Sequence, residues 1–220
     1  MDNLFISKPK AIGTIGRAWA DNCPSYWVDS YVDMINFNNR YLATGKDEFI
    51  HHVKGSVSYH EAMRNEMVEK MLGDWLFMVD TDHMYAPDIL MRLLAIMEEN
   101  KINVLSGVYT YKFQPHNVVA GNWDIKEDGK IAIAPLESLY IEQDIQQVGV
   151  VPGGCLLVKR KVYDAIKRHF KRAPFDIIQG LSEDYSFCFR CREMGIPVYL
   201  APRVECHHVI PTVLSVKDLA

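Results

Sequence analysis

An uninterrupted apolar stretch that ends in two carboxylates constrains this chain more than any other feature. Residues 75–79 read WLFMV, and Asp80, Thr81 and Asp82 follow directly. A run of large apolar side chains without alternation is typical of a central parallel strand that is covered on both faces. Because ligands of open α/β sheets bind outside the carboxyl ends of the strands, Asp80 and Asp82 are candidate site residues.

Helical patterns flank this strand. Residues 58–73 predict a helix in which Ser58 is the N-cap, Glu61 completes a capping box and Gly73 ends the helix. A second helix is predicted from Pro87 onward, where proline is tolerated in a first turn. The stretch INVLSGVYTYK, residues 102–112, then reads as another strand. The alternation of helix and strand indicates an α/β fold.

The second half continues the alternation. A strand-like stretch at 146–160 is broken by a Pro-Gly-Gly sequence at 152–154, and a basic helix follows it. Ser182 is predicted to cap a helix that Gly195 ends, and a strand is expected near residues 198–200. With 220 residues, of which 49% are hydrophobic, the chain is long enough to bury one sizeable core.

Composition excludes some classes of protein. The net charge of −4 argues against a polyanion-binding protein, and five irregularly spaced cysteines argue against a disulfide framework. No stretch resembles a cleavable signal, and the apolar runs are shorter than the roughly 20 residues that span a bilayer. We therefore expect reduced cysteines, a cytoplasmic location and no integral membrane segment.

Residues 159–172 depart from the overall charge. They contain seven Lys or Arg residues and one Asp, a local charge of +6, which leaves −10 for the rest of the chain. Such a run is commonly the solvated face of a helix. The alternative is a docking surface for an anionic acceptor or a membrane surface.

The two carboxylates after residue 79 have two explanations. Such a pair caps a following helix or simply faces water in many loops. At the end of a buried strand, paired carboxylate oxygens also suit a hard divalent cation that keeps positions open for water and substrate phosphates. A metal held there neutralises the charge of a departing diphosphate. The sequence therefore predicts a Mn²⁺ or Mg²⁺ site at Asp80 and Asp82.

Four ordered blocks within residues 58–210 resemble the GT-A glycosyltransferases, in particular compact family-2-like enzymes that phages often carry. The blocks are MVDTDHMYAPDIL, SGVYTYK, GGCLLVKRKVYD and SEDYSFCFRCREMGIPVYLAPRVECHH. The resemblance implies one GT-A, Rossmann-like domain over residues 1–220, with a mixed, mostly parallel sheet flanked by helices. It implies a donor half at about residues 1–112 and an acceptor half at about 113–220.

The same resemblance implies an activity. A metal-dependent enzyme of this kind moves one hexosyl or pentosyl unit from a nucleotide-diphosphate sugar to a hydroxyl acceptor, in many members with inversion. The expected location is the cytoplasm, or the host cytoplasm if a phage encodes the chain. Neither the sugar, the nucleotide nor the acceptor follows from the sequence, because pocket shape selects them.

Roles for single residues follow from the resemblance. In the D-x-D motif, Asp80 corresponds to a ligand of the donor nucleoside or the metal, and Asp82 to a ligand of the metal. The closing histidine of the family matches His208, with His207 in place of the usual glycine. The family's second acid at a helix start is a general base, which corresponds to Asp184, with Glu183 beside it.

Other residues are assigned to substrate binding. Arg64 and Asn65 match a donor-site element of the family, with Met63 inserted. Gly153 and Gly154 either let the backbone approach a substrate sugar closely or form an ordinary turn. From the residues alone, Asp184 is suited to take the proton of an acceptor hydroxyl or merely supplies charge at a helix start.

Three alternatives remain open at this point. A nucleotidyltransferase of related fold also uses carboxylates and Mg²⁺, although GTIGRAW is a poor phosphate loop. A non-catalytic module that binds nucleotide sugars would keep the fold without turnover. Finally, Cys188 and Cys191 have the spacing of a zinc pair, but their place on an amphipathic helix favours buried core thiols.

Overall fold

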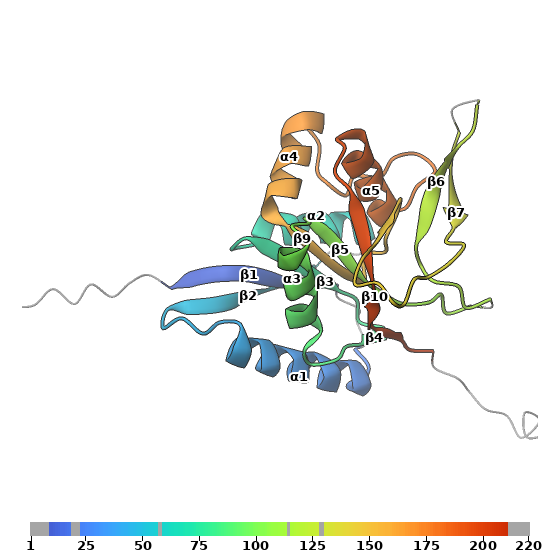
Figure 1. Cartoon of the computed structure of the whole chain (residues 1–220). Helices are drawn as coiled ribbons and strands as arrows, with labels where there is room; N and C mark the ends of the chain where they lie inside the picture. Colours follow the sequence, from blue (N-terminus) through green and yellow to red (C-terminus); the bar gives the residue numbers. More distant parts are fainter. Residues whose placement is uncertain (1–8, 19–22, 57–58, 114, 128–129, 211–220) are drawn as a thin grey trace, which may run out of the picture.

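The computed structural model describes residues 9–18, 23–56, 59–113, 115–127 and 130–210, which form a seven-stranded sheet between two layers of helices (Figure 1). The strands, in spatial order, are β2 (Glu48–Lys54), β1 (Lys10–Arg17), β3 (Trp75–Val79), β9 (Cys155–Lys159), β5 (Val104–Val108), β10 (Val198–Glu205) and β8 (Gln146–Val148). Strands β9 and β8 run opposite to the other five. The predicted mixed and mostly parallel α/β sheet is confirmed.

The centre of the sheet is buried because helices cover both faces. All five residues of β3 are buried, as the apolar stretch predicts. Successive side chains of a strand point to opposite faces, so Met78 packs with α2, α4 and α5, whereas Phe77 packs with α1 and α3. The helices are α1 (Ser25–Tyr41), α2 (His60–Lys70), α3 (Ile89–Glu99), α4 (Arg160–Phe170) and α5 (Glu183–Glu193).

The predicted helix ends are partly wrong. The helix expected over 58–73 is α2, whose N-cap is Tyr59 without a side-chain hydrogen bond, and Ser58 lies outside the described residues. Gly73 does not end the helix. It adopts a φ of 76° in the turn before β3, where a Cβ would lie 2.3 Å from the backbone nitrogen of Gly13. Glycine is therefore required there by both backbone conformation and space.

The start of α5 matches the expected position but not the expected bond. Ser182 is the N-cap, yet its hydroxyl donates to the side chain of Asp184 instead of accepting from the helix backbone. Gly195 follows the helix with a φ of 65°. The cap residue therefore orients a neighbouring carboxylate.

Two small pairs of strands complete the molecule. Strands β6 (Gly121–Ile125) and β7 (Ile131–Pro135) form a hairpin at the side of the sheet (Figure 1). Strand β4 (His83–Met84) pairs antiparallel with β11 (His207–His208), and His208 lies opposite His83. This second pairing brings a segment near the end of the chain to the loop after β3.

Two cysteines of α5 belong to the core. No disulfide joins any of the five cysteines, all of which lie in the described residues, and Cys188 and Cys191 are fully buried in the hydrophobic core, as the core interpretation expects. Across the described part of the chain, none of the helices has the length and apolar character needed to cross a membrane.

Candidate active site

The loop after β3 is fixed through the backbone of Asp80. Its N–H donates to the Tyr85 hydroxyl at 2.9 Å, and its carbonyl accepts from Trp27 Nε1 at 2.9 Å. The Tyr85 hydroxyl also lies 2.7 Å from the Gly154 carbonyl. The carboxylate of Asp80 is thus held at the carboxyl end of the strand, where the sequence places a site.

Arg64, on α2, joins three parts of the chain at this edge. Its guanidinium lies 3.3 Å from Asp80 Oδ1, lies 3.0 Å from Glu183 Oε1 and donates to the Gly153 carbonyl at 3.0 Å. Burial alone would lower the pKa of Arg64, but the charges of Asp80, Glu183 and Asp184 raise it above its usual value. Arg64 therefore stays charged and orients the acidic groups around it.

Both carboxylate oxygens of Asp184 accept hydrogen bonds. Oδ2 accepts from the Gly153 N–H at 3.2 Å, and Oδ1 accepts from the Tyr185 N–H at 2.9 Å and from the Ser182 hydroxyl. The side chain is therefore held in one orientation by donors from two segments. Such fixed geometry is what a proton acceptor needs when a substrate hydroxyl must be placed beside it.

The electrostatic surroundings make Asp184 more basic than an ordinary aspartate. Burial and the neighbouring charge of Glu183 raise the pKa of Asp184, and the Arg64 cation opposes that rise. Glu183, in contrast, is engaged by the Arg64 guanidinium. Of the two predicted catalytic acids, Glu183 is thus tied to a cation, whereas Asp184 is held by hydrogen-bond donors and has a raised pKa.

Gly153 and Gly154 sit against the charged groups. A Cβ at Gly153 would lie 2.4 Å from Cζ of Arg64. A Cβ at Gly154 would lie 2.8 Å from Asp80 Oδ2 and 3.1 Å from His83 Cε1. The two glycines therefore leave space for site side chains, which is a more specific role than an ordinary turn.

Asn65 has a different environment from that of its neighbour Arg64. Its amide nitrogen donates to Asp176 Oδ1 at 3.1 Å, and its amide oxygen accepts from the Phe175 N–H at 2.9 Å. In this structure the side chain secures the loop between α4 and α5 and does not join the acidic cluster. The predicted role of Asn65 in donor binding stays a prediction.

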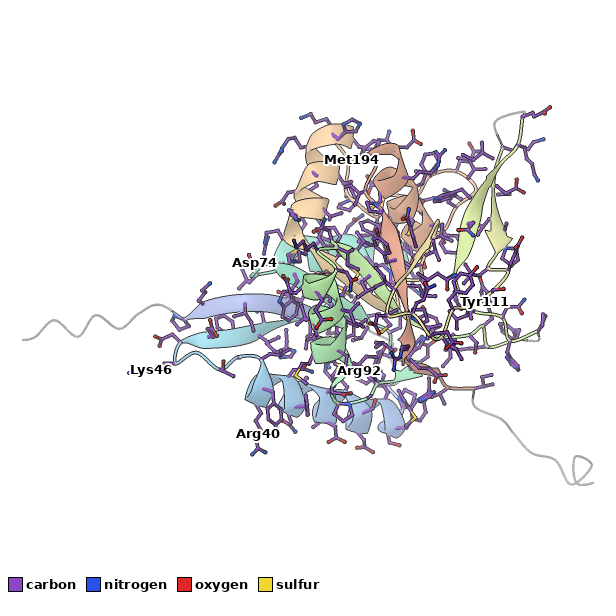
Figure 2. The ribbon with its side chains drawn as sticks, viewed as in Figure 1. Arg40, Lys46, Asp74, Arg92, Tyr111 and Met194 are labelled. Atoms are coloured by element: carbon purple, nitrogen blue, oxygen red, sulfur yellow. The ribbon has the colours of Figure 1, made fainter. Side chains whose placement is uncertain are left out.

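The segment after β5 contacts residues of the site. Tyr111 is 44% exposed and lies on the side of the molecule that carries the β6–β7 hairpin (Figure 2). Its hydroxyl is 3.2 Å from that of Tyr185, the residue after Asp184. The Tyr109 hydroxyl accepts from the Gly154 N–H at 3.1 Å. This segment therefore touches both the start of α5 and the glycine turn.

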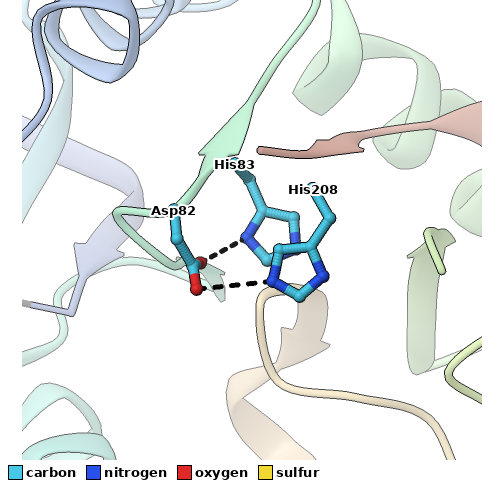
Figure 3. A group of neighbouring side chains, drawn as sticks. All are labelled: Asp82, His83 and His208. Atoms are coloured by element: carbon cyan, nitrogen blue, oxygen red, sulfur yellow. Dashed lines mark hydrogen bonds and ion pairs between the residues drawn. The ribbon is translucent and has the colours of Figure 1, made fainter. Parts of the chain in front are cut away.

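A second cluster contains Asp82, His83 and His208 (Figure 3). Asp82 Oδ1 lies 2.8 Å from His83 Nδ1, and Asp82 Oδ2 lies 3.4 Å from His208 Nε2. The two imidazole rings stack with centroids 4.2 Å apart. One ligand atom from each residue lies within 4.8 Å of the others, so the three side chains are placed to share one metal ion.

A hydrogen bond to Thr110 orients His208, which is a candidate metal ligand. Its Nδ1 lies 2.9 Å from the Thr110 carbonyl, so Nδ1 carries the proton. In the neutral ring, Nε2 then presents a lone pair to the Asp82 carboxylate, an arrangement that a cation between the two atoms makes favourable. Ligating histidines commonly donate their other N–H to a carbonyl in this way. His207 instead lies exposed, 3.8 Å from Glu205.

Asp82 is held as an anion. Burial would raise the pKa of Asp82, but hydrogen bonds with His83 and Lys112 outweigh it and lower the pKa well below the usual range. Lys112 Nζ lies 2.6 Å from Asp82 Oδ2. A carboxylate that is ionised at neutral pH is available to bind a cation.

The donor set fits a divalent transition metal. His83 is 1% exposed, and its Nε2 has no hydrogen-bond partner among the described residues. Two imidazoles and one carboxylate favour a first-row ion such as Mn²⁺ over Mg²⁺, which prefers oxygen ligands. Asp80, predicted as both a donor and a metal ligand, is paired with Arg64 and is not part of this three-residue cluster.

Sequence reasoning missed His83 and Lys112 as functional candidates. His83 directly follows the two carboxylates, and this adjacency is a signal that it is available to the same ligand. Lys112 lies within the SGVYTYK block, but no local pattern connects it with a carboxylate that precedes it by 30 residues.

One cavity lies away from both clusters. It has a volume of about 550 Å³ and is lined by β6, β8, the second half of α5 and the start of β10. None of the lining residues in the described chain belongs to the two acidic clusters. The candidate site is therefore identified by its chemistry and not by cavity size.

Comparisons with known proteins identify a family and a fold. The model of the family described as "Glycosyltransferase like family 2" matches residues 47–218. The solved structure of "A197 from STIV" has a TM-score of 0.56 and 14% identity, over 92% of this chain and 86% of that chain. GalNAc-T7, solved with UDP, GalNAc and Mn²⁺, has a TM-score of 0.61 and 11% identity, over 92% of this chain and 43% of its own.

No curated protein sequence matches the chain. The identities to the two solved structures are so low that they show a shared fold and no more. The family match, in contrast, covers most of the chain and includes every acidic and histidine residue of the two clusters. The chain therefore belongs to the glycosyltransferase-like family 2, has the GT-A fold and is a glycosyltransferase.

Proposed function

We propose that the chain is a metal-dependent, inverting glycosyltransferase that moves a sugar from a nucleotide-diphosphate donor to a hydroxyl acceptor. The observation that carries the proposal is the Gly153–Gly154 turn, which joins two chemical groups. The Gly153 N–H binds the Asp184 carboxylate, and the space beside Gly154 is bounded by Asp80 and His83. A base and a cation site thus adjoin one turn, as transfer between a donor and an acceptor requires.

Asp82, His83 and His208 would hold the metal, and their chemistry favours Mn²⁺. When bound, the ion supplies positive charge for the departing nucleoside diphosphate. Asp80 binds the donor nucleoside or the same metal, and Arg64 restrains it through their ion pair. Residues 1–112 then form a donor half and residues 113–220 an acceptor half, which places the base on the acceptor side.

Asp184 acts as the base. Its carboxylate takes the proton of the acceptor hydroxyl while the hydroxyl oxygen forms a bond to the anomeric carbon of the sugar. The bond from that carbon to the diphosphate oxygen breaks, and the electron pair leaves with the nucleoside diphosphate. Attack opposite the leaving group inverts the anomeric configuration. The raised pKa of Asp184 makes its carboxylate a better proton acceptor.

Fewer basic residues in and around helix α4 are available for docking than the sequence suggests. Lys159 and Lys167 pair with Glu98 and Glu69, respectively. Arg160 donates to the backbone carbonyls of Gly73 and Met71. The exposed cations that remain are Lys161, Arg168, Lys171 and Arg172. We assign these four residues to contact with an anionic acceptor. Binding to anionic but not neutral vesicles would identify a membrane surface as that partner. The cytoplasmic location stays a prediction.

Metal-dependent donor binding tests the proposed function. We expect one nucleotide sugar from a panel to raise the melting temperature with Mn²⁺ and not with a chelator, because a ligand of the native state stabilises it. The same donor should be hydrolysed or transferred only with Mn²⁺. Full activity in excess chelator would contradict metal dependence. Binding without any turnover would instead indicate a non-catalytic nucleotide-sugar module.

A further inference from the structure

Lys112 shares one carboxylate oxygen with the metal cluster. Its Nζ lies 2.6 Å from Asp82 Oδ2, the same oxygen that lies 3.4 Å from His208 Nε2. The side chains of Lys112 and Asp82 are 29% and 42% exposed, so solvent and ligands reach the pair. An ammonium and an imidazole lone pair therefore converge on a single acceptor atom.

The backbone leading to Lys112 is anchored one residue after another. The Tyr109 hydroxyl accepts from Gly154, the Thr110 carbonyl binds His208, and the Tyr111 hydroxyl contacts Tyr185. The segment is therefore fixed from β5 up to Lys112. The lysine side chain is a flexible four-carbon stem with a compact charge, so its ammonium is able to move while the backbone stays in place.

We propose that Lys112 is an exchangeable counter-ion, which neutralises Asp82 before the metal binds and contacts the donor diphosphate afterwards. The inference rests on the proposed function. A divalent ion bound to Asp82 Oδ2 would stand next to the ammonium, and like charges repel strongly at such separations. Lys112 is then displaced from the oxygen. A diphosphate beside the metal offers the ammonium a new partner, since lysine binds phosphate as a point charge.

A permanent salt bridge is the competing explanation. The two explanations predict opposite changes in metal affinity when the Lys112 side chain is removed. If Lys112 only supports Asp82 structurally, removing it disorders the carboxylate and weakens metal binding. If Lys112 competes with the metal, removing it tightens metal binding. In the second case the same substitution also weakens diphosphate binding, because the ammonium is lost as a ligand.

The test compares Lys112→Met with the parent chain by calorimetry, using Mn²⁺ alone and then pyrophosphate with saturating Mn²⁺. We expect Mn²⁺ affinity to rise about fivefold, the size of one partly exposed ion pair. Pyrophosphate affinity should fall about tenfold, as for a lost hydrogen bond to a charged group. The variant Lys112→Arg keeps the charge and should stay near the parent in both measurements.

The hairpin supplies a matched control. Lys126 pairs with Asp124 on the β6–β7 hairpin, outside both acidic clusters. Lys126→Met removes the same kind of ion pair and should change neither affinity. Circular dichroism and melting temperature establish that each variant is folded before its affinities are compared.

The possible outcomes separate the exchange of Lys112, its contact with the diphosphate and the metal site itself. Unchanged or weaker Mn²⁺ binding by folded Lys112→Met, while the parent binds Mn²⁺, overturns the exchange and leaves the proposed function intact. Tighter Mn²⁺ binding with unchanged pyrophosphate affinity overturns the contact with the diphosphate. A parent chain that binds no Mn²⁺ overturns both the metal site and the role of Lys112.

Discussion

The Arg64 cluster and the Asp82 cluster both gather acidic side chains at one edge of the sheet, but they neutralise charge in different ways. Arg64 is 6% exposed and makes fixed contacts with Asp80, Glu183 and Gly153. Asp82 is 42% exposed and is surrounded by an ammonium and two imidazoles, one with an unpaired nitrogen. The first cluster has a permanent cation, whereas the second is suited to exchange one.

The contrast explains why one family motif contains two aspartates with different surroundings. Asp80 pairs with the buried side chain of Arg64, a cation that cannot dissociate from the protein, and this pair fixes the geometry around Asp184 and the glycine turn. Asp82 pairs with the Lys112 ammonium, which solvent reaches, and this permits binding and release. The following predictions test this division between a fixed and an exchangeable cluster, in order of decreasing effect.

Asp184→Asn should give the largest loss. A general base contributes about 10² to 10⁴-fold, so kcat should fall by that factor while donor affinity, measured by calorimetry, changes little. The asparagine retains an acceptor for Ser182 and Tyr185, but its NH₂ group would face the Gly153 N–H, so melting temperature must be followed as well. Turnover within a few-fold of the parent would remove Asp184 from the base role and make Glu183 the next candidate.

Arg64→Met should destabilise the fold. Removing one partner of a buried ion pair costs about 3 to 5 kcal/mol, because the remaining charges stay buried without compensation. Urea unfolding measures the loss. Arg92, which donates to the Arg203 carbonyl at the surface (Figure 2), is the control. Arg92→Met should cost no more than about 0.5 kcal/mol. Equal costs for the two variants would show that the Arg64 cluster is not a fixed network.

His208→Ala should weaken metal binding, raising the Mn²⁺ concentration for half-maximal donor binding by about tenfold or more. His207→Ala is the matched control, because His207 is adjacent in sequence but its side chain is exposed beside Glu205. The titration is read from donor-dependent melting shifts. A larger effect at His207 would reverse the assignment of the metal ligand.

The pH profile should show the smallest effect. Burial first, and the charge of Glu183 second, raise the pKa of Asp184 above the ordinary aspartate value of about 3.9. Since the base works only when it is deprotonated, kcat should fall as pH drops through that raised pKa. The acid limb should therefore lie at higher pH than for an unperturbed aspartate. A profile that stays flat down to the ordinary aspartate range would contradict this environment for the base.

Local patterns predict the parts of the fold that depend on short-range physics. The buried strand at 75–79, the cap position of Ser182 and the placement of Asp80 at a strand end all follow from neighbouring residues. The direction of a cap side chain does not follow from neighbouring residues. The Ser182 hydroxyl, for example, binds Asp184 and not the helix backbone. The expected capping box before α2 fails at an earlier step, because the N-cap is Tyr59 and not Ser58.

Contacts between distant residues do not follow from local patterns, and only the family resemblance places Asp82 and His208 at one metal. Arg64 binds Glu183, which lies 119 residues away, and His208 approaches Asp82, which lies 126 residues away. These contacts depend on how β4 and β11 pair and on how α2 and α5 sit on the sheet. No spacing rule connects such positions, so the charge network around Arg64 and the role of Lys112 become visible only in three dimensions.

The position of β9 has a consequence for how the chain folds during synthesis. Residues 75–79 and 104–108 do not pair with each other, since residues 155–159 lie between them and pair with both. Until β9 has emerged from the ribosome, two central apolar strands have unpaired edges, which favour aggregation. A fragment that ends at residue 112 is therefore expected to be insoluble, and folding should be slow because the centre of the sheet pairs strands that lie far apart in the sequence.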